Sequence, residues 1–228
     1  MDRQSAGKIS GIQAEIGSKK TFLFDLDGTL IDSSKDIAVA VNYALAELGF
    51  PALQEEDIIK HVGYGGKKLI EGVLKTDDKM LIEKGVKLFR EYYFSNPAVY
   101  TTLYPYVYET LELLKRENKK IAVVTNKYQD ISELIIQKTG IAHLVDVIVG
   151  GDTTTSKKPD KEPVIFALRK LSSSPERAVM IGDSEADIQA GKSAGTKTVL
   201  VTYGFGKVEK ALKFKPDYVI HSLGEIVW

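Results

Sequence analysis

T-F-L-F-D-L-D-G-T-L-I-D, residues 21–32, is the stretch that decides the fold of this chain. Residues 21–24 form a short apolar run rich in aromatic and β-branched side chains, which is typical of a buried strand. Asp25, Asp27 and Gly28 follow this run. Two carboxylates at the end of a buried strand repel each other and lose hydration, so a metal cation would relieve both effects. Gly28 lets the backbone turn sharply beside them. A strand that ends in an acidic turn is the ordinary alternative, because Asp and Gly are common turn residues.

The composition narrows the class of protein. The chain has 228 residues, 43% of them hydrophobic, which suits one large domain or one domain with a smaller insertion. Lys plus Arg equals Asp plus Glu at 31 each, which argues against a nucleic-acid or membrane partner held by a general charge field. Cysteine is absent, so disulfide bonds, thiolate metal sites and thiol nucleophiles are excluded.

The N-terminal region predicts neither a membrane anchor nor an export signal. No apolar run approaches the ~20 residues that span a bilayer, and no signal-peptide-like apolar segment precedes residue 21. We therefore expect a cytoplasmic protein. Residues 1–20 are polar, and we expect an N-terminal arm in which Ile9, Ile12 and Ile16 could line one side of a short helix. We assign this arm no function.

Helical patterns fill the segment from residue 34 to residue 103. A helix capped by Ser33 or Ser34 is expected to run to about Leu48, where Gly49 ends it. Further helical patterns cover residues 55–61, 67–74 and 79–94. Because no strong strand pattern interrupts them, we expect a helical insertion here.

Strands and helices alternate regularly after residue 104. Strand patterns occupy residues 121–124, 145–149, 178–181, 198–201 and 218–220, and helix patterns occupy residues 106–119, 129–139, 161–171 and 185–194. Apolar strands that alternate with helices predict a parallel sheet covered on both faces. The expected fold is α/β: a Rossmann-like doubly wound parallel sheet core, residues 21–33 and 104–228, with the helical domain inserted at 34–103.

Polar side chains follow four of the predicted strands. Ligands of open parallel sheets bind outside the carboxyl ends of the strands, so these side chains are candidates for one common site. They are Asp25 and Asp27, Thr125 and Asn126, Lys158, and Asp183 and Asp187. Carboxylates, a hydroxyl, an amide and a lysine can together hold a metal and a phosphate.

Each candidate also has an ordinary structural interpretation. Thr125 and Asn126 could cap the next helix. Lys158 could be one of many solvated lysines. Asp183 and Asp187 could be the N-cap and first-turn acids of a helix. Together these interpretations do not explain why all four groups fall at strand ends.

The four groups resemble the motifs of the haloacid dehalogenase superfamily of phosphotransferases and phosphatases. D-L-D-G-T, residues 25–29, is similar to its first motif, D-x-D-G-T. Thr125 matches the second motif, a Thr or Ser after a strand, and Lys158 in K-K-P-D matches the third, a Lys before Pro. G-D-S-E-A-D, residues 182–187, matches the acidic fourth motif. The motifs occur in the family's order, and the resemblance covers about nine tenths of the chain.

The resemblance implies roles for the acidic residues. Asp25 would attack phosphorus and form an aspartyl-phosphate, and Asp27 would act as general acid and base. Mg²⁺ would be bound by the carboxylates of Asp25 and Asp183 and by the backbone carbonyl of Asp27. Asp187 could be a further ligand or a partner of a ligand. The dehalogenases lack an acid at the position of Asp27, since a halide leaves without a proton, so this residue favours phosphoryl chemistry.

The resemblance extends to phosphate binding and to the helical insertion, which is placed like the family's small cap domain. Thr125 would bind phosphate oxygens with nearby backbone N–H groups, Asn126 is a further candidate, and Lys158 would orient Asp25. H-V-G-Y-G-G-K-K, residues 61–68, resembles the V-G-x-G segment of phosphoglycolate phosphatases, which contacts the leaving group. The candidates in it are Gly63, Gly65 and Lys67. A plain helix–helix turn with solvated lysines is the alternative.

The function implied is a Mg²⁺-dependent phosphatase for a small phosphorylated metabolite, with 2-phosphoglycolate the leading candidate. A pyrophosphatase or nucleotidase of the same subclass, a sugar-phosphate mutase and a non-catalytic binding protein on the same fold remain open. K-P-D-K at residues 158–161 departs from the frequent K-P-D-P and weakens the subfamily assignment. We expect a monomer or homodimer with no nucleic-acid or membrane partner.

Overall fold

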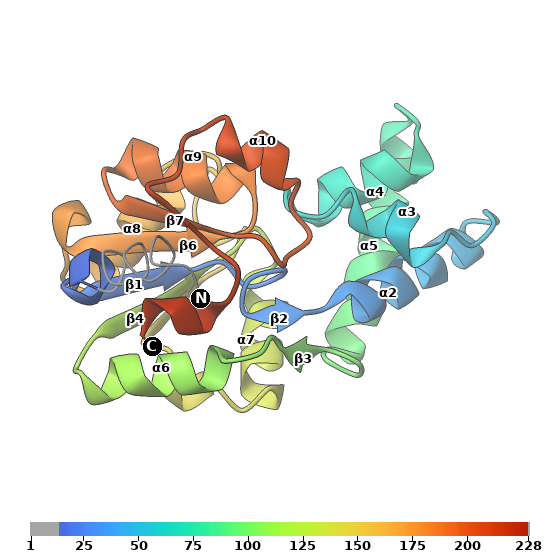
Figure 1. The fold of residues 1–228 in the computed structure, drawn as a ribbon. Helices are drawn as coiled ribbons and strands as arrows, with labels where there is room; N and C mark the ends of the chain where they lie inside the picture. The colour runs from blue at the N-terminus through green and yellow to red at the C-terminus, as the bar shows by residue number, and fades with distance from the viewer. Residues whose placement is uncertain (1–13, 228) are drawn as a thin grey trace.

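Six parallel strands form the central sheet of the structure, a computed structural model that describes residues 14–227 (Figure 1). Their order across the sheet is β5 (Val147–Val149), β4 (Lys120–Val124), β1 (Thr21–Phe24), β6 (Ala178–Gly182), β7 (Lys197–Val201) and β8 (Tyr218–Ile220). The predicted doubly wound α/β fold is confirmed. Because the chain builds outward from β1 in both directions, the order reverses at β1, and an open sheet has its ligand crevice at such a point.

The side chains of each strand alternate between two helical layers. Phe22 and Phe24 are fully buried on one face, with α6 (Val107–Arg116) and α7 (Gln129–Lys138). Leu23 points to the other face, which packs against α8 (Glu162–Lys170) and α9 (Glu185–Ala194). The short helix α10 (Val208–Leu212) covers α9 and β7 on that second face. Fully burying a side chain such as Phe contributes about 1.5–3 kcal/mol, so both layers hold β1 at the centre of the sheet.

The chain segment after β1 forms a group of helices that lies beside the sheet (Figure 1). It consists of α2 (Ser34–Glu47), α3 (Glu55–Ile59), α4 (Gly66–Leu74) and α5 (Lys79–Ser95). Helices α2 and α5 pack together, with the rings of Tyr43 and Tyr92 stacked at 4.6 Å between centroids. These bounds agree with the predicted helices. The division into a core and a separate domain at 34–103 stays a prediction.

Two very short strands, absent from the predictions, join this helical group to the sheet. β2 (Ile31–Asp32) and β3 (Thr102–Leu103) pair antiparallel where the chain leaves the core and where it returns. Strands of two residues carry no detectable periodicity, which is why the sequence pattern did not reveal them.

The predicted N-terminal arm lies mostly outside the described residues, as do Ile9 and Ile12. Ile16 is fully buried in the main hydrophobic core, and the carbonyl of Gly17 accepts a hydrogen bond from Lys119 at 2.6 Å. Between residues 14 and 227, no helix combines the length and the apolar character needed to cross a membrane.

Candidate active site

The predicted site residues meet at the carboxyl edge of the sheet because their strands are neighbours. β1 lies between β4 and β6, and Phe24 is in register with both Val123 and Ile181. The residues that follow these positions therefore leave the sheet side by side. They are Asp25 after β1, Thr125 to Lys127 after β4, and Asp183 after β6.

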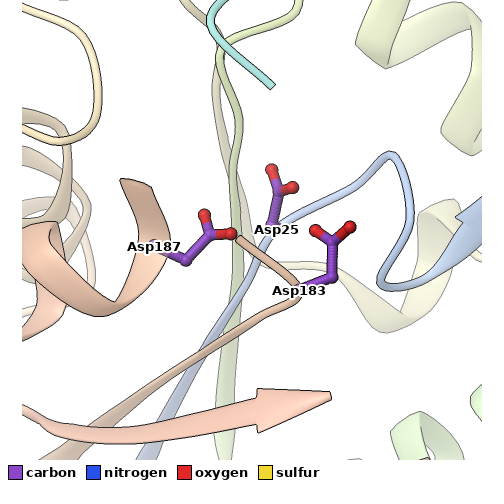
Figure 2. Close-up of side chains that lie close together, drawn as sticks. All are labelled: Asp25, Asp183 and Asp187. Carbon is purple, nitrogen blue, oxygen red and sulfur yellow. The ribbon is translucent and has the colours of Figure 1, made fainter. Parts of the chain in front are cut away.

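Three carboxylates converge at this edge, as Figure 2 shows. Asp25, Asp183 and Asp187 each offer an oxygen that lies within 4.8 Å of the others. All three side chains are buried, with Asp187 fully enclosed. Oxygen ligands at this spacing suit a hard divalent cation such as Mg²⁺ better than zinc, which is bound mostly by nitrogen and sulfur.

The electrostatics of the carboxylates favour the same cation. Burial, together with the charges of Asp187 and Asp25, raises the pKa of Asp183 well above its ordinary value. The backbone N–H groups of Phe205 and Gly206 oppose this shift by donating hydrogen bonds to Asp183 Oδ2 at 2.7 and 2.8 Å. Burial also raises the pKa of Asp25 to about 7, against the opposing charge of Lys158. A divalent cation would stabilise the ionised forms of both groups.

Lys158 is buried in the middle of this acidic group. Its ammonium donates to Asp25 Oδ1 and Asp187 Oδ1, both at 2.7 Å, and to the backbone carbonyl of Val124 at 2.5 Å. Burial alone would lower the pKa of Lys158, but the adjacent charges of Asp187 and Asp25 raise it, so the ammonium stays charged. The hydrogen bond from Lys158 to Asp25 Oδ1 holds this carboxylate in one orientation.

Asp187 uses both of its oxygens inside the protein. Oδ2 accepts from the backbone N–H of Ser184 at 3.0 Å and from the Ser184 hydroxyl at 2.6 Å, forming the capping box of α9. Oδ1 accepts from Lys158. These bonds place Asp187 as the partner that holds Lys158, in addition to its position near the other two carboxylates.

Asp27 faces a different set of partners, among them a lysine that was not predicted. The Ser33 hydroxyl donates to Asp27 Oδ1 at 2.5 Å, and the Lys127 ammonium lies 3.0 and 2.9 Å from the two carboxylate oxygens. Both members of this ion pair are buried, with 7% of the Lys127 side chain and 11% of the Asp27 side chain exposed. Lys127 directly follows Thr125 and Asn126 at the end of β4, and this position at a strand end was the signal for it in the sequence.

A cavity of about 50 Å³ opens between the helical group and the sheet edge. It is lined by Asp25, Asp27, Thr125, Asn126 and Lys127 from the core. Across from them, Gly63, Gly65, Tyr93 and a group of apolar side chains line it from the helical side. Lys67 is exposed at the start of α4 and does not line this cavity, so the structure does not bring it together with the other predicted site residues.

Asn126 ties the cavity walls together. Its side-chain amide donates to the carbonyls of Gly63 and Lys158 at 2.8 and 2.9 Å and accepts from the Lys158 N–H at 3.0 Å. Thr125 is buried beside it, and its hydroxyl accepts from the backbone N–H of Lys127 at 3.2 Å. Asn126 thereby positions both the Gly63 loop and the loop of Lys158.

Two further polar contacts join the helical group to the core. Arg90 on α5 pairs with Asp130 on α7 at 2.8 Å, and the Tyr64 hydroxyl donates to Glu185 at 2.9 Å. With the bond from Asn126 to Gly63, these contacts hold the helical group over the sheet edge.

Two glycines make room for the Asp183 carboxylate, a role that the sequence analysis did not predict. Gly28 has φ +82°, and a Cβ there would overlap the Asp183 carboxylate. A Cβ on Gly204 would collide with the Gly28 carbonyl and Asp183. The Y-G-F-G loop, residues 203–206, therefore folds tightly around this carboxylate. Two glycines after a strand were its only signal in the sequence.

Comparison with known proteins places these features in context. The profile of the haloacid dehalogenase-like hydrolases matches residues 22–201. A phosphoglycolate phosphatase of Aquifex aeolicus is 44% identical over 91% of this chain and 95% of that protein. The crystal structure of a predicted phosphoglycolate phosphatase from Haemophilus somnus has a TM-score of 0.86 and 31% identity, covering 92% of this chain and 97% of the other. CbbY from Rhodobacter sphaeroides in complex with phosphate has a TM-score of 0.79 and 26% identity, with 92% and 96% covered.

Proposed function

We propose that this chain, which belongs to the haloacid dehalogenase-like hydrolases, acts on 2-phosphoglycolate. The reaction would hydrolyse this substrate to glycolate and phosphate. Its similarity to phosphoglycolate phosphatases identifies it as a phosphoric monoester hydrolase. The observation that carries the proposal is the meeting of Asp25 and Asp27 at one small cavity, with Lys158 bonded to Asp25.

The chemistry needs all of these parts. Hydrolysis of phosphate monoesters can require accelerations of up to ~10²¹, while general acid–base catalysis supplies about 10²–10⁴. Covalent catalysis, positioning and charge stabilisation must supply the remainder. The convergence of an acid, a nucleophile and a buried ammonium supports a site of this kind.

In the proposed mechanism Asp25 attacks phosphorus and forms an aspartyl-phosphate as the bond from phosphorus to the ester oxygen breaks. Lys158 holds Asp25 through Oδ1 and offsets negative charge. Asp27 gives a proton to the departing oxygen and then takes one from the water that hydrolyses the intermediate. Ser33 and Lys127 hold Asp27 in place, and Lys127 stabilises the carboxylate that remains after Asp27 has given up its proton.

The residues present fit a magnesium ion. We propose that the carboxylates of Asp25 and Asp183 and the backbone carbonyl of Asp27 hold it, with Asp187 close by. When bound, Mg²⁺ would neutralise charge on the phosphate and the nucleophile as a Lewis acid. Thr125 lines the same cavity as Asp25 and would donate its hydroxyl to a phosphate oxygen.

Cavity size favours a small leaving group. The cavity volume of about 50 Å³ leaves room for only a few water molecules, since one water needs about 10–15 Å³. A two-carbon acid such as glycolate suits a space of this size better than a nucleoside does.

A substrate panel tests the proposal. Initial rates with Mg²⁺ or EDTA should be compared for 2-phosphoglycolate, pyrophosphate, a nucleoside monophosphate and glucose 1-phosphate. We expect kcat/KM for 2-phosphoglycolate to exceed the others by at least about tenfold, with turnover lost in EDTA. Preference for pyrophosphate or the nucleotide, or formation of glucose 6-phosphate, would overturn the proposed substrate in favour of a related activity.

The raised pKa values predict how Mg²⁺ stabilises the protein at different pH. Asp25 holds its proton more tightly when folded, with a pKa of about 7 against the ordinary 3.8. Its contribution to the stability of the metal-free protein is therefore fully present below about pH 3.8 and is lost as the pH rises through about 7. Because Mg²⁺ binds the ionised form, the difference in Tm between Mg²⁺ and EDTA samples should widen from pH 5 to pH 8.

Thermal unfolding in matched buffers measures this difference. Asp183→Asn should narrow it at every pH, because one carboxylate ligand is lost. A difference in Tm that stays constant from pH 5 to pH 8 would contradict the assignment of Asp25 and Asp183 to a metal site.

Three sequence predictions belong to this proposal. They are a cap domain at residues 34–103, a location in the cytoplasm, and a monomer or homodimer. The contacts of Asn126, Arg90 and Tyr64 support only the first of these, since they link the helical group to the core.

A further inference from the structure

The ammonium of Lys127 has hydrogen-bonding capacity that the protein does not use. A lysine ammonium carries three N–H donors, and two of them are used by the oxygens of Asp27. Within residues 14–227, the Tyr93 hydroxyl is the other polar side-chain group beside this ammonium. Lys127 is also the only cationic side chain among the residues that line the cavity in the part of the chain that the structure describes. A ligand that enters the cavity beside Tyr93 can therefore accept from this third donor.

The hydroxyl of Tyr93 is a second polar group at the same place. Tyr93 projects from α5 into the cavity lining and is only 1% exposed, and its hydroxyl makes no hydrogen bond within residues 14–227. The Lys127 ammonium lies 4.4 Å from the centre of the Tyr93 ring. A buried hydroxyl without a partner is unfavourable, so it marks a position where an acceptor on a ligand would be stabilised.

The position of Asp27 determines which part of a substrate meets these two groups. A general acid must lie within hydrogen-bond reach of the oxygen that it protonates, so the ester oxygen of the substrate lies beside Asp27. Lys127 is 2.9 Å from Asp27. Atoms one or two bonds beyond the ester oxygen therefore come next to Lys127 and Tyr93. In 2-phosphoglycolate the carboxylate carbon is two bonds from that oxygen.

We propose that Lys127 and Tyr93 form a subsite that binds a carboxylate on the leaving group, and thereby select phosphate esters of short 2-hydroxy acids. The inference rests on the proposed phosphatase function and adds the residues that choose its substrate. Lys127 comes from the core and Tyr93 from the helical group, so a bound carboxylate would join the two. The phosphoryl group would remain on the Asp25 and Thr125 side of the cavity.

The test pairs a substrate change with a residue change. Ethyl phosphate keeps the two-carbon ester and lacks the carboxylate, so the ratio of kcat/KM for 2-phosphoglycolate to kcat/KM for ethyl phosphate isolates the effect of the carboxylate. Lys127→Met should lower this ratio about 100-fold, mainly through a higher KM for 2-phosphoglycolate. If Lys127 serves only to hold Asp27, both substrates lose the same factor and the ratio stays constant, which would overturn the proposal.

Tyr93→Phe gives a second, independent measurement. It should lower the same ratio about 5- to 10-fold. Its Tm should stay the same or rise, because a buried hydroxyl without a partner is removed. A ratio equal to that of the wild type would remove Tyr93 from the subsite, and this measurement stands even if Lys127→Met folds poorly.

Lys119→Met is the matched control. Lys119 carries the same charge, its side chain is also 7% exposed, and its ammonium donates to the Gly17 carbonyl at 2.6 Å, outside the cavity lining. We expect its ratio to stay within about twofold of the wild type. An equal fall in Lys119→Met would replace specific recognition with a general effect of losing a buried lysine. A wild type that hydrolyses neither ester would instead overturn the proposed function, and a wild type without preference would overturn the proposed substrate.

Discussion

Asp25→Asn should lower kcat for 2-phosphoglycolate by at least about 10⁴-fold, since the amide cannot form the aspartyl-phosphate. The fold should persist, with the free energy of unfolding changed by less than about 1.5 kcal/mol. The substitution removes a buried charge whose pKa burial already raises to about 7. It also leaves Lys158 with the Asp187 carboxylate and the Val124 carbonyl as partners. Steady-state kinetics with Mg²⁺ and urea unfolding measure the two effects.

Asp32→Asn provides the control for this prediction. It makes the same chemical change seven residues later, on β2, where Asp32 Oδ1 accepts from the Ser34 backbone N–H at 3.1 Å and does not line the cavity. Its kcat should stay within about threefold of the wild type. Turnover by Asp25→Asn at a wild-type rate would show that another group attacks phosphorus.

The fold could be predicted from the sequence because its signals are local and repeated. Each strand of the central sheet is a short apolar run, and each run except the last two is followed by a chain segment with helical periodicity or a helix signal. Parallel pairing follows from this alternation. The short strands β2 and β3 and the helix α10 escaped prediction because two to five residues hold too little periodicity. The order of the strands also does not follow from any local pattern.

The grouping of the site residues could be predicted from one structural rule. The carboxyl ends of parallel strands share an edge, so Asp25, Thr125 and Asp183 were expected to lie near one another although about 100 residues separate the first two. The structure brings them together with Lys158 and Asp187. Their catalytic roles rest on the family resemblance and stay predictions.

Tyr93 could not have been found from the sequence. It lies on a helix with apolar neighbours, and an aromatic residue at that spacing is expected to be part of the packed core. Its role depends on its position beside Lys127, which comes from the helical group being placed over the sheet edge. Contacts between segments that are distant in sequence depend on the packing of the whole chain.

Lys158→Met should lower the free energy of unfolding by about 3–5 kcal/mol and kcat by at least about 10³-fold. The substitution removes the ammonium that bonds to Asp25 and Asp187 at 2.7 Å, and both carboxylates stay buried without it. Removing one partner of a buried ion pair is strongly destabilising for this reason. Without the ammonium, the pKa of Asp25, which burial already raises to about 7, should rise further, so the variant should regain stability as the pH falls from 8 to 5.

The effect should come from the unpaired charge and not from lost packing. Lys158→Met with Asp187→Asn should therefore be more stable than Lys158→Met alone, since one of the two unpaired carboxylates is gone. Lys157→Met changes the neighbouring residue in the same way and should shift stability by less than about 1 kcal/mol, because its ammonium is not in this network. Urea unfolding of the four proteins at pH 8 measures the differences. If Lys158→Met were as stable as the wild type, Asp25 and Asp187 would not need its charge, and the proposed means of orienting the nucleophile would be wrong.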